Sequence, residues 1–487
     1  MKRSLCLWAA CLLLLSGVVS CMDDEDFSTS PSDRLVFSTD TVSFDTVISG
    51  APTNTRTFMV YNHGEKALRV SRASLGRGDA SPFRVNVDGT FLEGGQAGDF
   101  EIYARDSIRV FLEMTAPVSD SDVPVAVEDD LMFQLESGQT QSVHLVAYGQ
   151  DVILMRGQVF SSDTTLSAQR PYQVMDSLVV AEGATLTLAA GTRLLFHPDA
   201  SLIVRGTVLA EGVLGDEVMM RGDRMGNMFT DQPYDLIPGQ WGGIVLTSTS
   251  YGNHFNYCDI HSGSFGVRCD SSDVNREKVR IENSVLHNTQ GDVLSATSSN
   301  VFVGNSQLTN AGGNCVTLLG GRSRFVHCTI ANFYAFAGGR GVALAYSNTA
   351  GGTDYPLHQA DFINCLITGY SDDEIMGTSK DDSETVAFNY FFSHCLLNTP
   401  EFVDERVVAC LWDNDEGDVC REQNFNPPFD IDRLSFTFTL DSLSPARGHA
   451  DAIASRQYFP TDRLGRDRLT DGLPDIGCYQ FIPHNEP

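Results

Sequence analysis

The sequence is poor in basic residues, and it has no long hydrophobic run after its first twenty residues. It contains 33 lysines and arginines against 63 aspartates and glutamates, so its formal net charge is −30. Such a surface repels phosphate backbones and anionic lipid headgroups, which argues against nucleic acid as a partner. No later segment is long and apolar enough to span a membrane. Apolar residues do not recur at helical spacing over any long stretch, which excludes a helical bundle.

Cysteine is present without the spacing of a metal site. The chain has 12 cysteines and no CxxC, so no zinc site is expected. Cys6 and Cys11 lie in the first apolar segment and Cys21 follows it, which leaves nine, an odd number, so at least one thiol is unpaired. Cys410 and Cys420 could close a short loop disulfide in an exported protein, and a reduced pair is the alternative.

The first twenty residues are typical of an export signal. Lys2 and Arg3 precede the apolar stretch LCLWAACLLLLSGVV, so residues 1–20 are predicted to be a signal peptide. The ending VVSC resembles the lipobox of bacterial lipoproteins, which implies lipidation of Cys21; an ordinary cleaved signal is the alternative. Residues 21–33 are acidic and rich in Ser and Pro, so we expect a flexible tether. That acidic cluster also resembles the surface-export signal of Bacteroidota lipoproteins, which implies an outer-membrane lipoprotein exposed at the cell surface.

Residues 34–150 are predicted to form an all-β unit. Segments of alternating polar and apolar residues, such as VSFDTVI, TFMVYN and SIRVFLEM, are separated by turn sequences such as NHGEK and ESGQ. About seven such strands in roughly a hundred residues are typical of an immunoglobulin-like β-sandwich. The likeness is architectural, because the Cys…Trp…Cys pattern of immunoglobulin domains is missing.

Residues 151–400 carry a repeat whose period indicates a solenoid. The segments RIENSVL, FVGNSQL, RFVHCTI, DFINCLI and FFSHCLL each place a small residue two positions before Ile or Leu. Successive small residues Ser284, Ser306 and Cys328 are 22 positions apart, as expected for one coil of a parallel β-helix. Residues i and i+2 of a strand share a face, so both members of each pair point into the cylinder. We predict a right-handed, single-stranded parallel β-helix of about ten coils.

The stretch RFVHCTI sets His327 beside Cys328, an arrangement found in nucleophile–base pairs and in metal sites. The repeat favours a structural role instead, because Asn or His precedes the small residue in each of these five coils and is expected to stack at a corner of the cylinder. The predicted ladder consists of Asn283, Asn305, His327, Asn364 and His394. The predicted interior stack of thiols, which behave as small hydrophobes, consists of Cys258, Cys328, Cys365 and Cys395.

Three further stretches carry a resemblance to a known family. GATLTLAAGTRLLFHPDASLIVRGTVLAEG, QWGGIVL and the ending SPA…DRLGRDR…PDIGCYQF resemble the right-handed parallel β-helix (pectate-lyase-like) surface lipoproteins of the Bacteroidota. The likeness covers residues 150–487 and implies that residues 401–487 form an irregular capping segment. It also implies polysaccharide chemistry, since enzymes of this superfamily cleave acidic polysaccharides. The GHG and NTD motifs of its hydrolases are missing, however, and no acidic stripe continues from Asp259 along its register.

Two insertions, residues 331–360 and 368–390, lengthen consecutive coils and should meet on one flank. They carry aromatic rings that could stack on sugars, namely Tyr334, Tyr346, Tyr355 and Tyr370. They also carry carboxylates that could bind calcium, namely Asp372, Asp373, Glu374, Asp381 and Asp382. The alternative is a pair of solvated loops whose aromatic residues pack on the cylinder.

These features favour a monomeric, non-catalytic binding or adhesion scaffold for glycans or other surface ligands, joined to the membrane only by its lipid. One alternative is a polysaccharide lyase or glycoside hydrolase, and another is a structural partner of an outer-membrane assembly. The enzyme alternative is less favoured than the binding scaffold but stays open, because no lyase or hydrolase motif is present and no catalytic residue can be assigned. Calcium is the one candidate cofactor, and a polysaccharide or a surface protein is the candidate partner.

Overall fold

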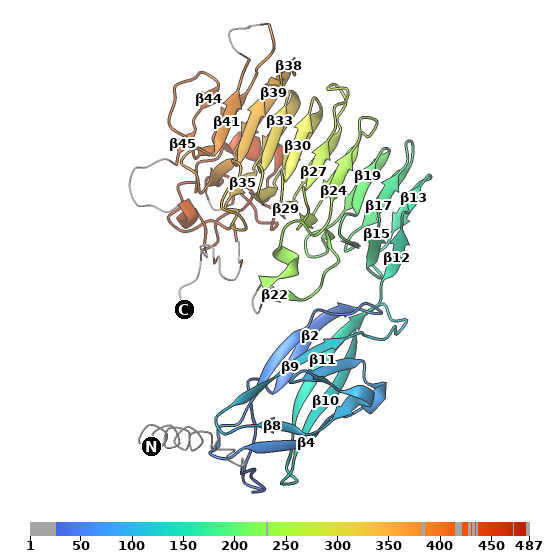
Figure 1. The fold of residues 1–487 in the computed structure, drawn as a ribbon. Coiled ribbons are helices and arrows are strands. Elements are labelled where there is room, and N and C mark those ends of the chain that lie inside the picture. Colours follow the sequence, from blue (N-terminus) through green and yellow to red (C-terminus); the bar gives the residue numbers. More distant parts are fainter. Residues whose placement is uncertain are drawn as a thin grey trace, which may run out of the picture. The chain divides into compact units, whose positions relative to one another are not determined.

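The structure is a computed structural model that describes residues 26–229, 232–380, 385–413, 421–426, 430, 434, 437–470 and 472–483. The signal peptide, Cys21 and the next four residues of the tether lie outside these residues. The chain divides into two compact units, one formed by residues 1–118 and 125–149 and the other by residues 119–124 and 150–487. Both units are built from β-strands, as Figure 1 shows.

The N-terminal unit is a sandwich of two antiparallel sheets around a buried core that includes Phe58, Leu112 and Phe133. One sheet has the order β1 (Val36–Phe37), β3 (Arg56–Tyr61), β9 (Ser107–Met114), β5 (Phe83–Val87), β6 (Thr90–Phe91). The other has the order β2 (Thr41–Ile48), β11 (Thr140–Gln150), β10 (Val125–Leu135), β4 (Leu68–Leu75), β7 (Gln96–Ala97), with β8 (Phe100–Ile102) also on β4. Two 3-10 turns, η1 (Gly78–Ala80) and η2 (Glu93–Gly95), complete the unit.

The second unit is a right-handed parallel β-helix whose coils build three parallel sheets, here called sheets I, II and III. Sheet I has 11 strands: β12 (Ile153–Arg156), β15 (Tyr172–Met175), β18 (Arg193–Phe196), β21 (Val218–Gly222), β26 (Cys258–His261), β29 (Val285–Thr289), β32 (Gln307–Ala311), β35 (Thr329–Asn332), β40 (Leu366–Gly369), β43 (Leu396–Leu397), β45 (Leu411–Trp412). Sheet II has nine: β13 (Val159–Phe160), β16 (Leu178–Val180), β19 (Ser201–Val204), β24 (Gly243–Leu246), β27 (Val267–Cys269), β30 (Leu294–Thr297), β33 (Val316–Leu319), β36 (Leu344–Ser347), β41 (Ile375–Thr378).

Sheet III has ten strands: β14 (Thr164–Leu166), β17 (Thr185–Ala189), β20 (Thr207–Glu211), β25 (Asn253–Asn256), β28 (Val279–Glu282), β31 (Asn300–Gly304), β34 (Gly321–Val326), β39 (Leu357–Ile363), β42 (Phe391–Ser393), β44 (Val407–Val408). The corners carry the hairpins β22 (Asn227–Phe229)–β23 (Gln232–Pro233) and β37 (Thr349–Ala350)–β38 (Thr353–Asp354) and the 3-10 turn η3 (Tyr234–Leu236). The C-terminal segment carries the 3-10 turn η4 (Arg421–Asn424) and the helix α2 (Ala452–Tyr458). No helix among the described residues has the length and apolar character needed to cross a bilayer.

Stacked side chains fill the interior of the cylinder. The rings of Phe325, Phe362 and Phe392 stack at centroid distances of 4.9 Å from coil to coil. The small residues of the repeat form a second column, in which Ser284 and Ser306 are buried beside the four predicted thiols. Because identical positions of successive coils lie directly above one another, a repeat in the sequence becomes a continuous column in the core.

The corner between sheets III and I carries the predicted ladder. Each ladder residue has a left-handed backbone, with φ between 51° and 56°. Asn305 Nδ2 donates to Asn283 Oδ1 at 2.8 Å, and Asn364 Nδ2 lies 3.0 Å from His327 Nε2. Asparagine tolerates this conformation well, which explains its recurrence at a corner that each coil must turn.

The coils extend further than the sequence analysis predicted. β44 and β45 continue sheets III and I, so Leu411 pairs with Leu396 and Cys410 falls in register with Cys395. Cys410 is a free thiol packed against the core, so the structure places it in the interior column instead of the proposed loop disulfide. Cys420 lies outside the described residues.

The C-terminal segment was predicted to cap the cylinder, and its described residues lie along the side of the cylinder (Figure 1). Phe425, Phe438, Ile476 and other apolar residues of this segment pack against the outer face of sheet I. They meet side chains such as Leu366, which points outward from β40. The segment therefore forms a second, smaller core outside the β-helix.

Candidate functional site

A cleft of about 400 Å³ lies between the outer face of sheet III and helix α2. The strands β28, β31, β34 and β39 form its floor, and the end of α2 forms one wall. Its lining combines charged, amide and aromatic side chains: Glu277, Arg280, Glu282, Asn300, Val301, Phe302, Arg322, Ser323, Arg324, Gln359, Gln457, Tyr458 and Phe459. This composition suits a ligand with many hydroxyl groups and flat apolar faces.

The floor of the cleft is a row of outward side chains from neighbouring strands. The parallel register pairs Arg280 with Phe302, Phe302 with Arg324, and Arg324 with Asp361. Arg280 lies 4.1 Å above the centre of the Phe302 ring, which orients the guanidinium over the floor. Alternation along each strand sends these residues outward, while neighbours such as Val301 and Val303 point into the core.

One end of the row is an ion-pair network. Arg280 donates to Glu277 at 2.7 Å and to Glu282 at 3.2 Å. His254 lies between Glu282, 3.1 Å from its Nε2, and Glu211, 2.9 Å from its Nδ1. The hydrogen bond to Glu282 raises the pKa of His254, whereas the pKa of Glu282 is lowered because His254 and Arg280 outweigh its burial. The Glu282 carboxylate is therefore held ionised, which suits binding better than proton donation.

The other arginines of the floor differ in their partners. Arg324 pairs with Asp361 at 2.9 Å and donates to the Tyr458 hydroxyl at 3.3 Å. The Arg322 guanidinium, by contrast, has no carboxylate partner among the described residues and is half-buried at the cleft. An unpaired guanidinium in a cleft can bind a ligand carboxylate in bidentate geometry.

The wall of the cleft is anchored by the ladder. Asp451 caps α2 by accepting from Ile453 and Ala454, and its own N–H donates to Asn364 Oδ1 at 2.7 Å. Gly304 on the floor leaves room for the ring of Phe459, which a side chain at that position would strike. The ladder therefore also fixes where the aromatic wall lies.

Two of the four predicted stacking tyrosines are not available for a ligand. Tyr334 and Tyr346 are buried, and Tyr346 stacks on Phe388 at a centroid distance of 5.6 Å. This corrects the expectation, because strand β36 runs through the supposed insertion and turns Tyr346 into the core. Tyr355 is half-buried, and Tyr370 is exposed beneath the Arg340 guanidinium, 4.9 Å from its ring centre.

The predicted calcium ligands do not form one cluster in the described part of the chain. Glu374 is buried, and its two carboxylate oxygens accept from the backbone N–H groups of Ala343 and Ser371 at 2.7 Å each. Burial raises the pKa of Glu374 to about 7. Its role is therefore to tie two loops together instead of facing solvent with Asp372 and Asp373. Asp381 and Asp382 lie outside the described residues.

The cleft was not predicted, and only part of it has a signal in the sequence. The outward positions of sheet III alternate with core positions in RIENS, FVGNS and RFVHC, so Arg280, Phe302 and Arg324 could have been aligned. The wall could not be predicted in this way, because Tyr458 and Phe459 come from a segment more than 100 residues further along the chain, outside the repeat. Nothing in the repeat specifies on which face that segment docks.

The comparisons with known proteins give distant structural similarity and no match to a protein family. No protein-family model matches the chain, and no curated protein matches it significantly. Among solved structures, the Agl-KA catalytic domain is 10% identical to this chain, with a TM-score of 0.26. The match covers 71% of this chain and 76% of the chain of that domain. The catalytic domain of a GH87 α-1,3-glucanase with bound tetrasaccharides is 9% identical, with 70% and 91% covered and a TM-score of 0.20.

A PapD-like domain of human CEP192 is 13% identical, with 26% of this chain and 90% of that domain covered and a TM-score of 0.18. At these values none of the likenesses carries a conclusion about activity. What the structure defines is the fold class, a β-sandwich unit followed by a right-handed parallel β-helix.

Proposed function

We propose that the protein is an exported surface lipoprotein that binds a glycan carrying at least one carboxylate, and that the cleft over sheet III is its binding site. The observation that carries the proposal is the Arg322 guanidinium, which faces the cleft beside aromatic rings and has no carboxylate partner among the described residues. Uronic acids offer both a carboxylate for such a group and flat apolar faces for the rings.

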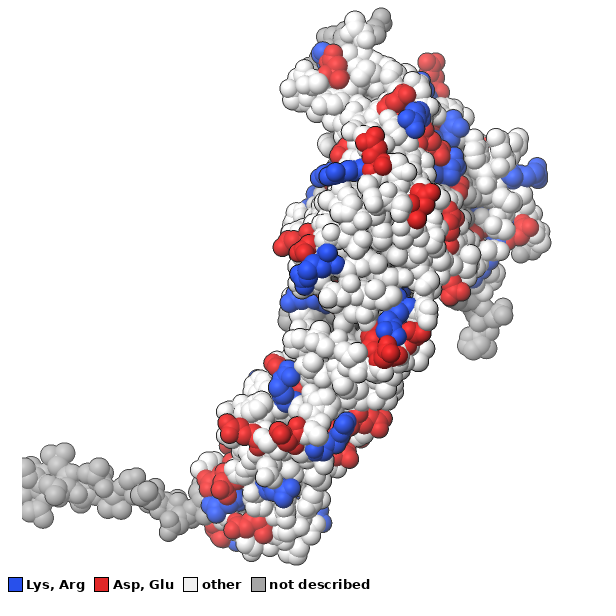
Figure 2. Space-filling view, turned by 90° about the vertical axis from the view of Figure 1, so that its right-hand side faces the viewer, with Lys and Arg blue, Asp and Glu red and all other residues white. Residues whose placement is uncertain are grey.

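The net charge of −30 disfavours a polyanionic glycan at long range, but it does not set the affinity at close range. Charges more than about 8 Å apart are largely screened at physiological salt, so the groups lining the cleft decide its affinity. On the face drawn in Figure 2, acidic and basic side chains are interspersed and not gathered by sign. The proposed anchor supports the same role, because a lipid on Cys21 and an acidic tether would hold a binding domain at the cell surface.

The experiment compares matched arginine variants in a glycan-binding assay. Arg322→Ala should weaken binding of uronate-containing oligosaccharides at least about 10-fold, the scale of a lost charge-assisted hydrogen bond. Arg205→Ala removes an exposed arginine of the same unit and should leave affinity unchanged. Equal affinity of Arg322→Ala and the unsubstituted protein, or a preference for neutral glycans that Arg322→Ala retains, would overturn the proposal.

A lyase is the second candidate, and Arg322 also favours it. Lyases of uronate polymers remove a proton with an arginine or lysine base, and an arginine without a carboxylate partner beside a cleft could take that role. The same protein samples distinguish the two functions. Release of unsaturated sugars from a uronate polymer, abolished in Arg322→Ala, would assign catalysis, whereas binding without product would assign a scaffold.

A further inference from the structure

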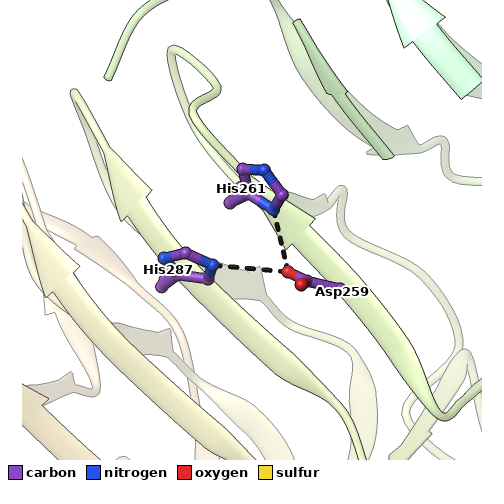
Figure 3. A group of neighbouring side chains, drawn as sticks. All are labelled: Asp259, His261 and His287. Atoms are coloured by element: carbon purple, nitrogen blue, oxygen red, sulfur yellow. Dashed lines mark hydrogen bonds and ion pairs between the residues drawn. The ribbon is translucent and has the colours of Figure 1, made fainter. Parts of the chain in front are cut away.

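A second group of functional side chains lies on the outer face of sheet I, away from the cleft. Asp259 and His261 come from β26, and His287 comes from the adjacent strand β29. The register pairs His261 directly with His287, and all three side chains project from the outer face toward one another (Figure 3). Alternation explains the placement, because Cys258, Ile260 and Leu286 on the same strands point into the core.

The three side chains direct one potential ligand atom each toward a common point. Asp259 Oδ1 lies 2.8 Å from His261 Nδ1 and 3.3 Å from His287 Nε2. The three atoms lie within 4.8 Å of one another, so small adjustments of the side chains around an ion would give coordination distances. The imidazole rings are stacked at 4.8 Å between centroids, which leaves Asp259 facing both.

The surroundings orient His261 as metal-bound histidines are oriented. Asp235 Oδ1 lies 2.7 Å from His261 Nε2, so that nitrogen donates its hydrogen to a carboxylate and Nδ1 faces Asp259 and His287. Arg221 pairs with Asp235 at 2.5 Å, and Asn288 Nδ2 donates to the Leu236 carbonyl at 2.9 Å, which holds the η3 turn in place. A metal-binding histidine nearly always donates its second N–H to such a partner, which fixes its tautomer.

The group is reachable from solvent on one side. The side chain of His261 is only 4% exposed, but His287 and Asp259 are 16% and 33% exposed. Three protein ligands on one side with solvent on the other leave coordination positions open for water or a ligand, as in catalytic zinc sites and in sites with two histidines and one carboxylate.

We propose that Asp259 Oδ1, His261 Nδ1 and His287 Nε2 form a binding site for a first-row divalent transition metal ion, with Asp235 as the positioning carboxylate. Two imidazoles select such ions over calcium and magnesium, which prefer oxygen ligands. The site is therefore different in place and in chemistry from the calcium site that the sequence suggested among Asp372, Asp373 and Glu374. It does not depend on the proposed glycan function.

Isothermal titration of the chelator-treated protein with Zn²⁺ tests the site directly. We expect one ion per chain, and His287→Ala should weaken binding by at least about 100-fold, since even changes to groups outside the ligand set cost 10–100-fold. Asp235→Asn should weaken it by about 10–100-fold without removing a ligand. His358→Ala, which removes an exposed histidine of the same unit, is the control and should bind as the unsubstituted protein does.

Cobalt gives a second readout that separates this site from binding elsewhere. Co²⁺ bound through two imidazoles and a carboxylate should give visible absorption bands that His287→Ala lacks, while a thermal melt shows that the variant is folded. The proposal is overturned if the unsubstituted protein binds no Zn²⁺, or if folded His287→Ala and His261→Gln bind Zn²⁺ with undiminished affinity, because the ion would then be held by other groups.

Discussion

Two buried histidines of the β-helix differ in their partners and in their charge. His327 lies at the corner between sheets III and I, and His261 lies on the outer face of sheet I. At the corner, His327 Nδ1 lies 3.2 Å from the Gly477 carbonyl and Nε2 lies 3.0 Å from Asn364 Nδ2, so the ring is neutral. On the face, His261 lies between two carboxylates. Burial and the nearby Arg468 guanidinium hold the pKa of His327 well below its usual range. Burial also opposes a charge on His261, but Asp259 and Asp235 outweigh it and raise its pKa to about 9.

The difference shows that burial alone does not set the role of a histidine in this fold. A neutral ring at the corner can both donate and accept, which the ladder and the C-terminal segment require. A ring between carboxylates holds a proton that a metal ion can displace. The partners, and not the sequence spacing, separate a structural histidine from a candidate ligand.

The largest effect should follow from breaking the corner. His327→Leu removes the partner of the Gly477 carbonyl and of Asn364, whose amide also holds the Asp451 carbonyl at the start of α2. We expect a loss of about 3 kcal/mol in the unfolding free energy of the β-helix, the scale of buried polar groups left without partners.

Urea unfolding followed by tryptophan fluorescence measures this loss, because Trp241 and Trp412 belong to the β-helix and residues 26–149 contain no tryptophan. His358→Leu changes an exposed histidine and should shift stability by less than about 0.5 kcal/mol. Similar losses of unfolding free energy in the two variants would mean that His327 contributes no more to stability than an exposed histidine does.

The next prediction concerns pH, because the two histidines should make stability depend on pH in opposite directions. The folded-state pKa of His261 is about 9, above its unfolded value near 6.5, so its stabilisation is complete below pH 6.5 and is lost as the pH rises through 9. The pKa of His327 is lowered on folding, so its stabilisation is present above pH 6.5 and is lost as the pH falls.

The measurement is the unfolding free energy between pH 5 and pH 10 with a chelator present. The stability difference between the unsubstituted protein and His261→Gln should shrink by about 3 kcal/mol from pH 6 to pH 9.5. For His327→Gln the difference should instead grow as the pH rises from 5 to 7. Parallel pH profiles for the two variants would show that the two sites do not differ in charge.

The repeat was predictable from the sequence, and what docks on it was not. The positions of Asn283, Asn305 and His327 follow from alternation and a fixed period, which are local properties of the chain. His261 and His287 also had a signal, because each directly follows the interior Ile or Leu in consecutive coils. The cleft depends on where the segment carrying Phe459 packs, which no local pattern encodes.

The smallest effect should come from the interior column next to His327. The hydroxyls of Ser284 and Ser306 donate to the carbonyls two residues earlier at 2.7 Å, and the Cys328 thiol contacts the equivalent Val326 carbonyl at 3.5 Å. A serine at position 328 would find the same acceptor, so Cys328→Ser should cost less than about 1 kcal/mol, whereas Cys328→Leu should overpack the column and cost about 1–3 kcal/mol. Urea unfolding of both variants tests this order. A Cys328→Ser protein that loses more stability than Cys328→Leu would mean that sulfur is required at this level of the column, and that the coils are less interchangeable than their repeat implies.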